Sequence, residues 1–526
     1  MDTRFAALSL RNRPHPVFKP VLTPSPQTTQ QLEAENKGAM IAYFQRPKTV
    51  QNRRKSMCYR HKSAHSTPVC GYTCDFAQQD PDSPMPAPTI NSADTLIFAR
   101  WIIPVTPASA PLSHYAIAIN DGVISAILPA TEAQAITAKE ILHLDHHAVM
   151  PGLINAHGHA AMSLFRGMAD DKALHTWLND HIWPAEGQWV NEDFVRDGSE
   201  LAIAEMLRSG TTTFSDMYFF PEVTAQVARK AGIRAQLSFP IFDFPCAWGS
   251  GPDDYFRKGL ALLDEHKYSA LINIAFGPHA PYTVGDEAMQ RIVTFAAELD
   301  VPIQIHLHET QQEVDDAVAQ SGKRPIARLA ELGLLGPKTQ CVHLTALNDE
   351  DIATLASHGC QAVHCPESNL KLASGFSPVE KMRVAGINVA IGTDGAASNN
   401  DLDLFGEMRT AALLGKAVAG DASALPDSYA LEMATINGAK ALSIDHLVGS
   451  LEVGKQADII AIDLAALEQQ PIYNPVSQIA YTNISHRVRY SWIMGRKVLD
   501  NGELTTLDSR DIIARAELWR KKISGE

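Results

Sequence analysis

The sequence contains no run of about 18 consecutive apolar residues, the length that a helix needs to cross a bilayer. Basic residues are also fewer than acidic ones: the chain has 45 Lys and Arg and 59 Asp and Glu, and its formal net charge is -14. A chain with this balance repels nucleic acid and anionic lipid. We therefore expect no nucleic acid and no membrane among its partners, and neutral or cationic small molecules as its substrates.

Cysteine is sparse as well. The seven cysteines follow no regular framework and stand at Cys58, Cys70, Cys74, Cys246, Cys341, Cys360 and Cys365. This usage is typical of a reducing compartment, so we expect a cytoplasmic protein. Cys70 and Cys74, with His61 and His65 nearby, could form a zinc knuckle, but no second paired spacing follows, and free thiols are the preferred interpretation.

The first 84 residues differ in composition from the rest. They hold 12 Lys and Arg against 6 Asp and Glu, whereas the remaining residues hold 33 against 53. The stretch RPKTVQNRRKSMCYRHKS has little apolar periodicity and PDSPMPAP is rich in proline, so residues 1–84 are predicted to be a disordered basic extension. No apolar core of a secretory signal is present there. A transit peptide is one interpretation, and the preferred one is a start codon assigned too far upstream, with Met85 as the working start.

Both ends of the remaining chain are rich in β-strand patterns. TLIFARWIIPV and YAIAINDGVISAILPA stand near the beginning, and GSLEVGKQADIIAIDL and VRYSWIMGRKVLDNGEL near the end. Asp121-Gly122 and Asn501-Gly502 are hairpin signals within them. Because neither set of strands would bury a core alone, we predict one small β-sandwich, with its first half in 85–148 and its second half, followed by a C-terminal helix, in 445–526.

The middle of the chain, 149–444, alternates apolar runs with helical segments, as βα units do. Eight runs recur in order: GLINAHGH, TTTFSDM, RAQLSFPIF, LINIAFGPH, VPIQIHLHE, TQCVHLT, CQAVHCPES and INVAIGTDG. Between the first two, Asn191 and Gly210 are predicted to begin and end a helix. The fold class is therefore α/β, a (β/α)8 TIM barrel inserted in the β-sandwich built from both chain ends.

Polar side chains gather where these runs end, which in a βα barrel is the edge that carries the active site. They are His157, His159, Asp216, His279, His306, Glu309, His343, His364, Glu367 and Asp394. A single strand histidine is more often structural than functional. We therefore assign no role to His364 or to His308, beyond a supporting position for the latter.

Four of these side chains could bind a metal ion. His157 and His159 are at i and i+2, a spacing that turns both imidazoles to one side of a strand. With His306 and Asp394 they would offer three imidazoles and one carboxylate, a ligand set that suits zinc. The His-x-His pair alone is not specific, and Asp394 in GTDG could be a turn former. The combination at one barrel rim favours a metal site.

PGLINAHGHAAMSLFRG, HLHET, VHLT, PESNLKLASG and GTDGAASNNDLDLF resemble the amidohydrolase superfamily. Within it, the chain is similar from about residue 90 to about residue 500 to the branch of 5-methylthioadenosine/S-adenosylhomocysteine deaminases and related triazine hydrolases. The resemblance implies one zinc ion per chain, held by the four residues above. Binuclear members carry a carboxylated lysine on the fourth strand, and LINIAFGPHAP has no lysine. Iron(II) is the alternative, since imidazole and carboxylate ligands suit both metals.

The resemblance also implies roles in hydrolytic deamination of an adenine ring. Glu309 would protonate a ring nitrogen, and His343 and Asp394 would move the proton of the attacking water to the departing ammonia. Glu186 and His279 would bind the ribose, and Glu309 and Asp394 would also contact the substrate. Metal binding would make hydroxide available near neutral pH.

The expected substrate is a small nucleoside. We expect 5-methylthioadenosine first, with S-adenosylhomocysteine and adenosine as further candidates. The alternatives on the same scaffold are a guanine or 8-oxoguanine deaminase and a triazine hydrolase. A scaffold protein without catalysis is a further alternative. We also expect a homo-oligomer.

Overall fold

A computed structural model describes residues 90–107 and 110–526 of the chain. The predicted basic extension 1–84, Met85 and the cysteine pair Cys70 and Cys74 lie outside the described residues. In the described part, no helix has both the length and the apolar character needed to cross a membrane.

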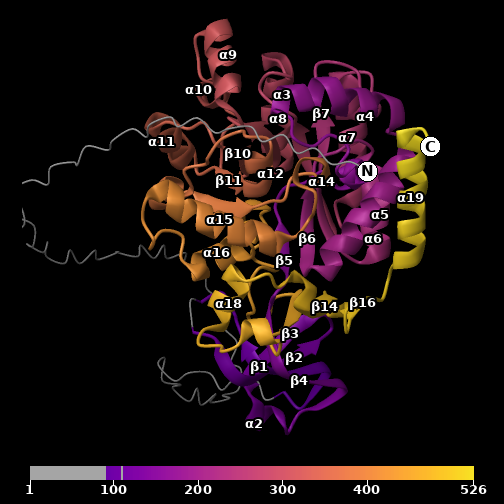
Figure 1. Cartoon of the computed structure of the whole chain (residues 1–526), viewed down its shortest axis with the longest axis vertical. Helices are drawn as coiled ribbons and strands as arrows, with labels where there is room; N and C mark the ends of the chain where they lie inside the picture. Colours follow the sequence, from indigo (N-terminus) through magenta and orange to yellow (C-terminus); the bar gives the residue numbers. More distant parts are fainter. Residues whose placement is uncertain (1–89, 108–109) are drawn as a thin grey trace, which may run out of the picture. The chain divides into compact units, whose positions relative to one another are not determined.

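Strands from both chain ends build a single sheet, as predicted. Its eight strands run in the order β16-β15-β14-β13-β4-β1-β2-β3, so that β4 from the N-terminal side pairs with β13 from the C-terminal side. Figure 1 shows the indigo strands of the first part beside the yellow strands of the last part. Their bounds are β1 (Ser92–Ile102), β2 (Leu112–Asn120), β3 (Val123–Pro129), β4 (Thr137–Pro151), β13 (Ile459–Asp463), β14 (Val488–Ile493), β15 (Arg496–Asp500) and β16 (Glu503–Leu504).

Both predicted hairpin turns are confirmed. Asp121 and Gly122, between β2 and β3, have φ values of 50° and 77°. Asn501 and Gly502, between β15 and β16, have 50° and 90°. Two successive left-handed residues match the right-handed twist of the flanking strands, which explains why Asp-Gly and Asn-Gly stand there.

The sheet is curled, so that strands far apart in the strand order come together. Ala457 donates its N–H to the carbonyl of Gly122 at 2.8 Å and accepts from the N–H of Gly495 at 3.1 Å, so the β2–β3 turn lies against the β14–β15 turn. Ile117, Ile459 and other buried residues fill the enclosed space. One curled sheet therefore provides the shared core that was expected of a sandwich built from both ends.

All eight predicted apolar runs form parallel strands of a second sheet, which closes into a barrel. The strands are β5 (Leu153–Asn155), β6 (Thr211–Asp216), β7 (Arg234–Ile241), β8 (Ile272–Pro278), β9 (Ile303–Leu307), β10 (Thr339–His343), β11 (Gln361–His364) and β12 (Asn388–Ile391). The first and last strands meet where Ala156 donates its N–H to the carbonyl of Ile391 at 2.9 Å. The TIM-barrel prediction is confirmed.

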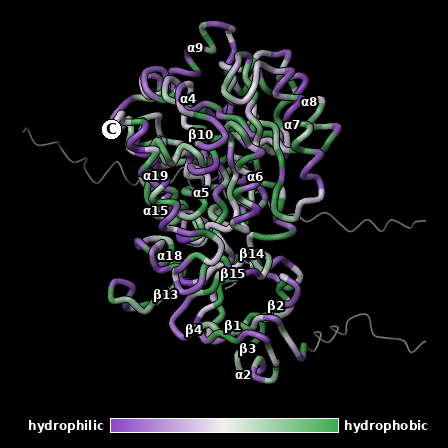
Figure 2. The backbone as a smooth tube through the Cα atoms, turned by 90° about the vertical axis from the view of Figure 1, so that its right-hand side faces the viewer, coloured by the Kyte–Doolittle hydropathy of each residue, from purple (hydrophilic) through white to green (hydrophobic). Residues whose placement is uncertain are grey.

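Helices surround the barrel, and each β-to-β connection contains at least one. They are α3 (Leu174–Trp177), the π-helical turn Leu178–Ile182, α4 (Trp183–Trp189), α5 (Glu192–Arg208), α6 (Pro221–Ala231), α7 (Pro252–His266), α8 (Asp286–Leu299), α9 (Gln311–Ser321), α10 (Pro325–Glu331), α11 (Asp349–His358), α12 (Pro366–Lys371), α13 (Val379–Val384), α14 (Ala396–Asn399), α15 (Leu404–Ala419), α16 (Asp427–Met433), α17 (Ile436–Ala441), α18 (Pro475–Tyr481) and α19 (Ser509–Ser524). Hydrophilic and hydrophobic stretches alternate along outer helices such as α5 and α19 (Figure 2). This alternation lets one face of each helix pack on the molecule while the other faces water.

The helix predicted after Asn191 forms as expected. Asn191 accepts hydrogen bonds from the N–H groups of Asp193 and Phe194, and α5 ends at Arg208 before Gly210, whose φ is 91°. At the other end of the chain, α19 packs against α5. The domain boundaries at 84/85, 148/149 and 444/445 stay predictions; β4 runs on to Pro151, and only Gly152 separates it from β5.

Candidate metal centre and active site

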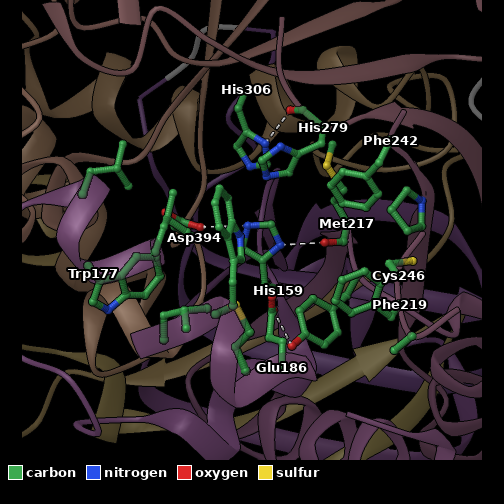
Figure 3. Close-up of a pocket in the computed structure, with 18 of the residues that line it drawn as sticks. His159, Trp177, Glu186, Met217, Phe219, Phe242, Cys246, His279, His306 and Asp394 are labelled. Atoms are coloured by element: carbon green, nitrogen blue, oxygen red, sulfur yellow. Dashed lines mark hydrogen bonds and ion pairs between the residues drawn. The ribbon is translucent and has the colours of Figure 1, made fainter. Parts of the chain in front are cut away.

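The predicted site residues gather at the C-terminal ends of the barrel strands. A pocket of about 320 Å³ opens there, and all of them except His157 line it: His159, Glu186, His279, His306, Glu309, His343 and Asp394. His157 is fully buried, with its Nε2 3.2 Å from Nε2 of His306. In Figure 3, His159, His306 and Asp394 point toward one another.

The His-x-His pair reaches the site by a different route from the predicted one. We expected both imidazoles on one side of a strand, but β5 ends at Asn155, and His157 and His159 lie in the segment that follows. Asp216, at the end of β6, accepts a hydrogen bond from the N–H of Ala160 at 2.7 Å and fixes this segment. The two rings still converge, with centroids 4.9 Å apart.

The four predicted ligands meet around a common centre. Oδ1 of Asp394 lies 3.2 Å from Nε2 of His159 and 3.6 Å from Nε2 of His157. Two groups of potential ligand atoms lie within 4.8 Å of one another, His157 with His159 and Asp394, and His157 with His306 and His343. Because His157 belongs to both groups, the predicted ligands form one cluster, and His343 adjoins it.

The hydrogen bonds of the imidazoles suit a metal site. Each ring uses Nδ1 to donate to a fixed oxygen: His157 to Gln304 at 2.9 Å, His159 to the Met217 carbonyl at 2.6 Å, His306 to the His279 carbonyl at 2.8 Å, and His343 to Asn369 at 2.9 Å. A proton on Nδ1 leaves the lone pair on Nε2, which is the atom that faces the cluster. Histidines that bind metals are commonly fixed in this way. The donor set therefore fits a divalent ion such as zinc.

Asp394 is held as an ionised carboxylate. Burial opposes its ionisation, but the imidazoles of His157 and His159, 3.6 and 3.2 Å away, keep its pKa well below the usual range. Oδ2 also accepts from Ser368 at 2.7 Å. Gly392 allows the close approach of this segment to the one that follows β5, since a Cβ there would lie 2.8 Å from the backbone N and O of His157. The GTDG motif is therefore more than a turn.

A layer of glutamines lies in the barrel beneath the cluster, and the sequence reasoning missed it. Gln304, on β9, accepts from His157, and its Nε2 donates to the Ala156 carbonyl, to Ser215 and to Gln340. Gln236 in turn donates to Gln340 at 2.9 Å. The detectable signal is one glutamine inside each of three barrel strands, in RAQLSF, IQIHL and TQCVH.

Glu309 and His343 stand side by side at the pocket wall. His343 Nε2 lies 3.6 Å from Oε2 of Glu309. Burial, together with the charge of Asp394, raises the pKa of Glu309 to about 8, so this carboxyl carries a proton at neutral pH. Burial also lowers the pKa of His343, which keeps that imidazole neutral. The pair thus combines a proton donor with a proton acceptor.

Glu186 and His279 also line the pocket. Glu186, on α4, accepts a hydrogen bond from the hydroxyl of Tyr218 at 2.8 Å, and burial raises its pKa to about 7. His279 is fixed by Thr283, whose hydroxyl lies 3.0 Å from Nδ1. Tyr218 was not among the predicted residues, although it lies two residues beyond the end of β6.

Two polar residues of the strand ends serve the fold instead of the pocket. Glu367 turns to the surrounding helices, where Oε1 accepts from Thr410 of α15 at 2.7 Å. His308 is fully buried, with Nδ1 3.1 Å from the Ala346 carbonyl and Nε2 accepting from the N–H of Ile326. These contacts join the end of β9 to α10, and neither of them reaches a predicted metal ligand.

Comparison with known proteins places this site in a family. The family model described as "Amidohydrolase family" matches residues 148–498. A relative from Saccharophagus degradans, named 5-methylthioadenosine/S-adenosylhomocysteine deaminase, is 56% identical over 435 residues, which are 82% of this chain and 98% of the relative.

Two solved structures share the architecture. An adenosine deaminase from Xanthomonas campestris with bound zinc is 47% identical, with a TM-score of 0.82 over 83% of this chain and 100% of that one. An atrazine chlorohydrolase from Arthrobacter aurescens complexed with zinc is 23% identical, with a TM-score of 0.76 over 81% and 99% of the two chains, and shows the shared fold alone. From the family match and the identity to these relatives, the chain belongs to the amidohydrolase family.

Proposed function

We propose that the chain is a zinc-dependent hydrolase that removes the amino group from the adenine ring of 5-methylthioadenosine, with S-adenosylhomocysteine and adenosine as further candidate substrates. The observation that carries this proposal is the buried carboxyl of Glu309, 3.6 Å from Nε2 of His343, beside an imidazole and carboxylate cluster at one end of a pocket. The relative that is 56% identical bears the name of this activity.

One zinc ion per chain would be held by His157, His159, His306 and Asp394, with iron(II) as the alternative. When bound, the metal supplies a hydroxide nucleophile at neutral pH. Elemental analysis of the purified chain should find close to one zinc per chain. A content far below one, which zinc addition does not raise, would favour the scaffold without catalysis.

The side chains of the pocket account for the proton movements. Glu309 donates its proton to a nitrogen of the adenine ring, which makes the adjacent C6 a better electrophile. His343 and Asp394 receive a proton from the attacking water and pass it to the amino group. The water oxygen becomes the carbonyl oxygen at C6, the bond from C6 to the amino nitrogen breaks, and ammonia leaves. One proton of the water ends on the ammonia, and the other returns to Glu309, where it replaces the proton given to the ring nitrogen.

Glu186 and His279 are proposed to bind the ribose. Glu186 is positioned by Tyr218 and keeps a second carboxylate oxygen free of that bond, so it can accept from a sugar hydroxyl. A site built to bind a hydroxyl rejects an analogue without it by about 10⁴-fold or more, because its polar groups are left unpaired. This pair would therefore select nucleosides over free bases.

Incubation with 5-methylthioadenosine tests the proposal directly. We expect stoichiometric release of ammonia and the corresponding inosine product, followed by the ultraviolet absorbance of the purine. A panel with S-adenosylhomocysteine, adenosine, guanine, 8-oxoguanine and a chlorotriazine, measured by ammonia release (by chloride release for the chlorotriazine), ranks the candidates. Absence of product from every adenine nucleoside would refute the proposed function.

Glu186→Ala separates the nucleoside activity from the alternatives on the same scaffold. We expect kcat/KM for the nucleoside to fall by about 100-fold or more, because a charge-assisted hydrogen bond to the sugar is lost. Full activity of the variant would favour a free-base deaminase or a triazine hydrolase. The homo-oligomeric state and the cytoplasmic location stay predictions.

A further inference from the structure

Apart from imidazoles, no side chain among the described lining residues of the pocket can carry a positive charge. Its ionisable groups are carboxyls, imidazoles, tyrosine hydroxyls and one thiol, and neither Lys nor Arg lines it. An anionic group that entered this pocket away from the predicted metal ligands would lose its hydration without gaining a Lys or Arg partner. The carboxyls Glu186, Glu309 and Asp394 would add repulsion where they are ionised.

An aromatic cluster occupies one side of the pocket. Rings pack in sequence from Tyr218 to Phe219, with centroids 5.0 Å apart, then to Phe242 at 6.1 Å and Phe244 at 5.1 Å. Cys246 lies on the same side. Figure 3 shows Phe219, Phe242 and Cys246 together across the pocket from Trp177. We call Phe219, Phe242, Phe244 and Cys246 the aromatic cluster.

The aromatic cluster adjoins both residues assigned to the ribose. Tyr218, which contacts Phe219, donates to Glu186, and the ring of Phe242 lies 5.1 Å from the ring of His279. A ribose held by Glu186 and His279, with its base at Glu309, would have its 5′ carbon beside these rings. The 5′ substituent leaves the sugar at C4′, on the other side of the ring oxygen from the carbon that carries the base, so a cluster beside the ribose can receive it.

We propose that the aromatic cluster is a subsite for an uncharged, apolar 5′ substituent, so that the chain acts on alkylthio-adenosines and discriminates against nucleosides whose 5′ group carries a carboxylate or a phosphate. This inference rests on the proposed function and narrows it from three nucleosides to one class. S-adenosylhomocysteine, with its amino-acid end, becomes a poor substrate, and 5-methylthioadenosine a good one.

A panel of nucleosides that differ at the 5′ position tests the subsite. We expect kcat/KM for 5-methylthioadenosine to exceed that for 5′-deoxyadenosine by about tenfold, the order expected for burying a small apolar group. S-adenosylhomocysteine and adenosine 5′-monophosphate should fall at least about tenfold below 5-methylthioadenosine, since their charged ends find no cation. Equal efficiency with S-adenosylhomocysteine and 5-methylthioadenosine would overturn the subsite while leaving the deaminase function standing.

Phe219→Ala shows whether the aromatic cluster is responsible. The variant should lose about tenfold in kcat/KM for 5-methylthioadenosine and much less for 5′-deoxyadenosine, because only the first substrate has a group that reaches the ring. A loss of equal size for both substrates would mean that Phe219 contacts the base or the sugar, and would overturn the assignment. Tyr268→Ala is the matched control: this residue is 90% exposed before β8, at the opposite end of the barrel.

If the wild-type chain, loaded with zinc, deaminates none of the nucleosides, the proposed function is refuted instead. The two failures are therefore distinguishable. A melting curve for each variant separates misfolding from altered specificity, and the wild-type panel stands even if Phe219→Ala does not fold.

Discussion

The two ends of the pocket are built on different principles. At the metal end, His157 is fully buried, His306 is 7% exposed, and each imidazole is tied by Nδ1 to a fixed oxygen. At the outer end, Trp183, Phe244 and Tyr282 are 39%, 45% and 49% exposed. Aromatic packing, not a network of hydrogen bonds, arranges the rings of the aromatic cluster.

This difference indicates which side chains of the pocket tolerate substitution and which do not. A metal ligand must lie within a few tenths of an ångström of its place, so it needs buried partners that fix its rotamer and its tautomer. An apolar substituent requires only a surface of roughly the right shape, because dispersion and the hydrophobic effect are not directional. We infer that substitutions at the metal end abolish the reaction, whereas those at the outer end change the substrate.

The largest effect is expected at the metal ligands. His306→Ala should remove the zinc and lower kcat by at least about 10³-fold, because hydroxide is then no longer available at neutral pH. Elemental analysis and the ammonia assay measure the two losses. His308→Ala is the matched control, since that imidazole is also buried and lies two residues away but contacts Ala346, Ile326 and Asp351. It should lower the melting temperature and retain the zinc; retention of zinc by His306→Ala would contradict the ligand assignment.

Local sequence was sufficient for the fold and for most of the polar residues that the structure brings together at one end of the barrel. Apolar runs of strand length, separated by helical segments, specified all eight barrel strands because both faces of a parallel strand are buried. Asp121-Gly122 and Asn501-Gly502 specified their turns because few residues adopt two successive left-handed conformations. Active sites lie at the C-terminal ends of barrel strands, and this rule then identified the polar residues there as site candidates.

The sequence does not show which backbone segments and contacts bring some residues into the site. His157 and His159 lie beyond the end of β5, and their convergence depends on Asp216 and Gly392, which are distant in the chain. Likewise, nothing near Gln304 indicates that it supports His157, because that contact spans 147 positions. Tertiary packing decides such partners, and a strand pattern shows only that a polar residue is buried.

The second prediction concerns proton delivery. Glu309→Gln should keep the zinc and the size of the side chain but lose the acidic proton, so kcat should fall by about 10²-fold or more. Elemental analysis confirms the first point and steady-state kinetics the second. Glu367→Gln is the control, because it changes a partly buried carboxyl that contacts α15 outside the pocket. Near wild-type turnover of Glu309→Gln would mean that another group protonates the ring.

The smallest of the three effects tests whether the metal end depends on the layer beneath it. Gln304→Leu keeps a side chain of similar size but removes the acceptor for Nδ1 of His157, so zinc affinity should fall by about 10- to 100-fold. Competition with a chromogenic chelator measures this without reference to activity. Gln236→Leu is the matched control, since it alters the same layer and reaches His157 only through Gln340 and Gln304. If both variants weaken zinc binding equally, the glutamine layer acts through general stability. If only Gln304→Leu weakens it, the orientation of one imidazole is the reason. The rigid part of the pocket then includes the glutamines beneath the metal ligands, in contrast to the adaptable outer end.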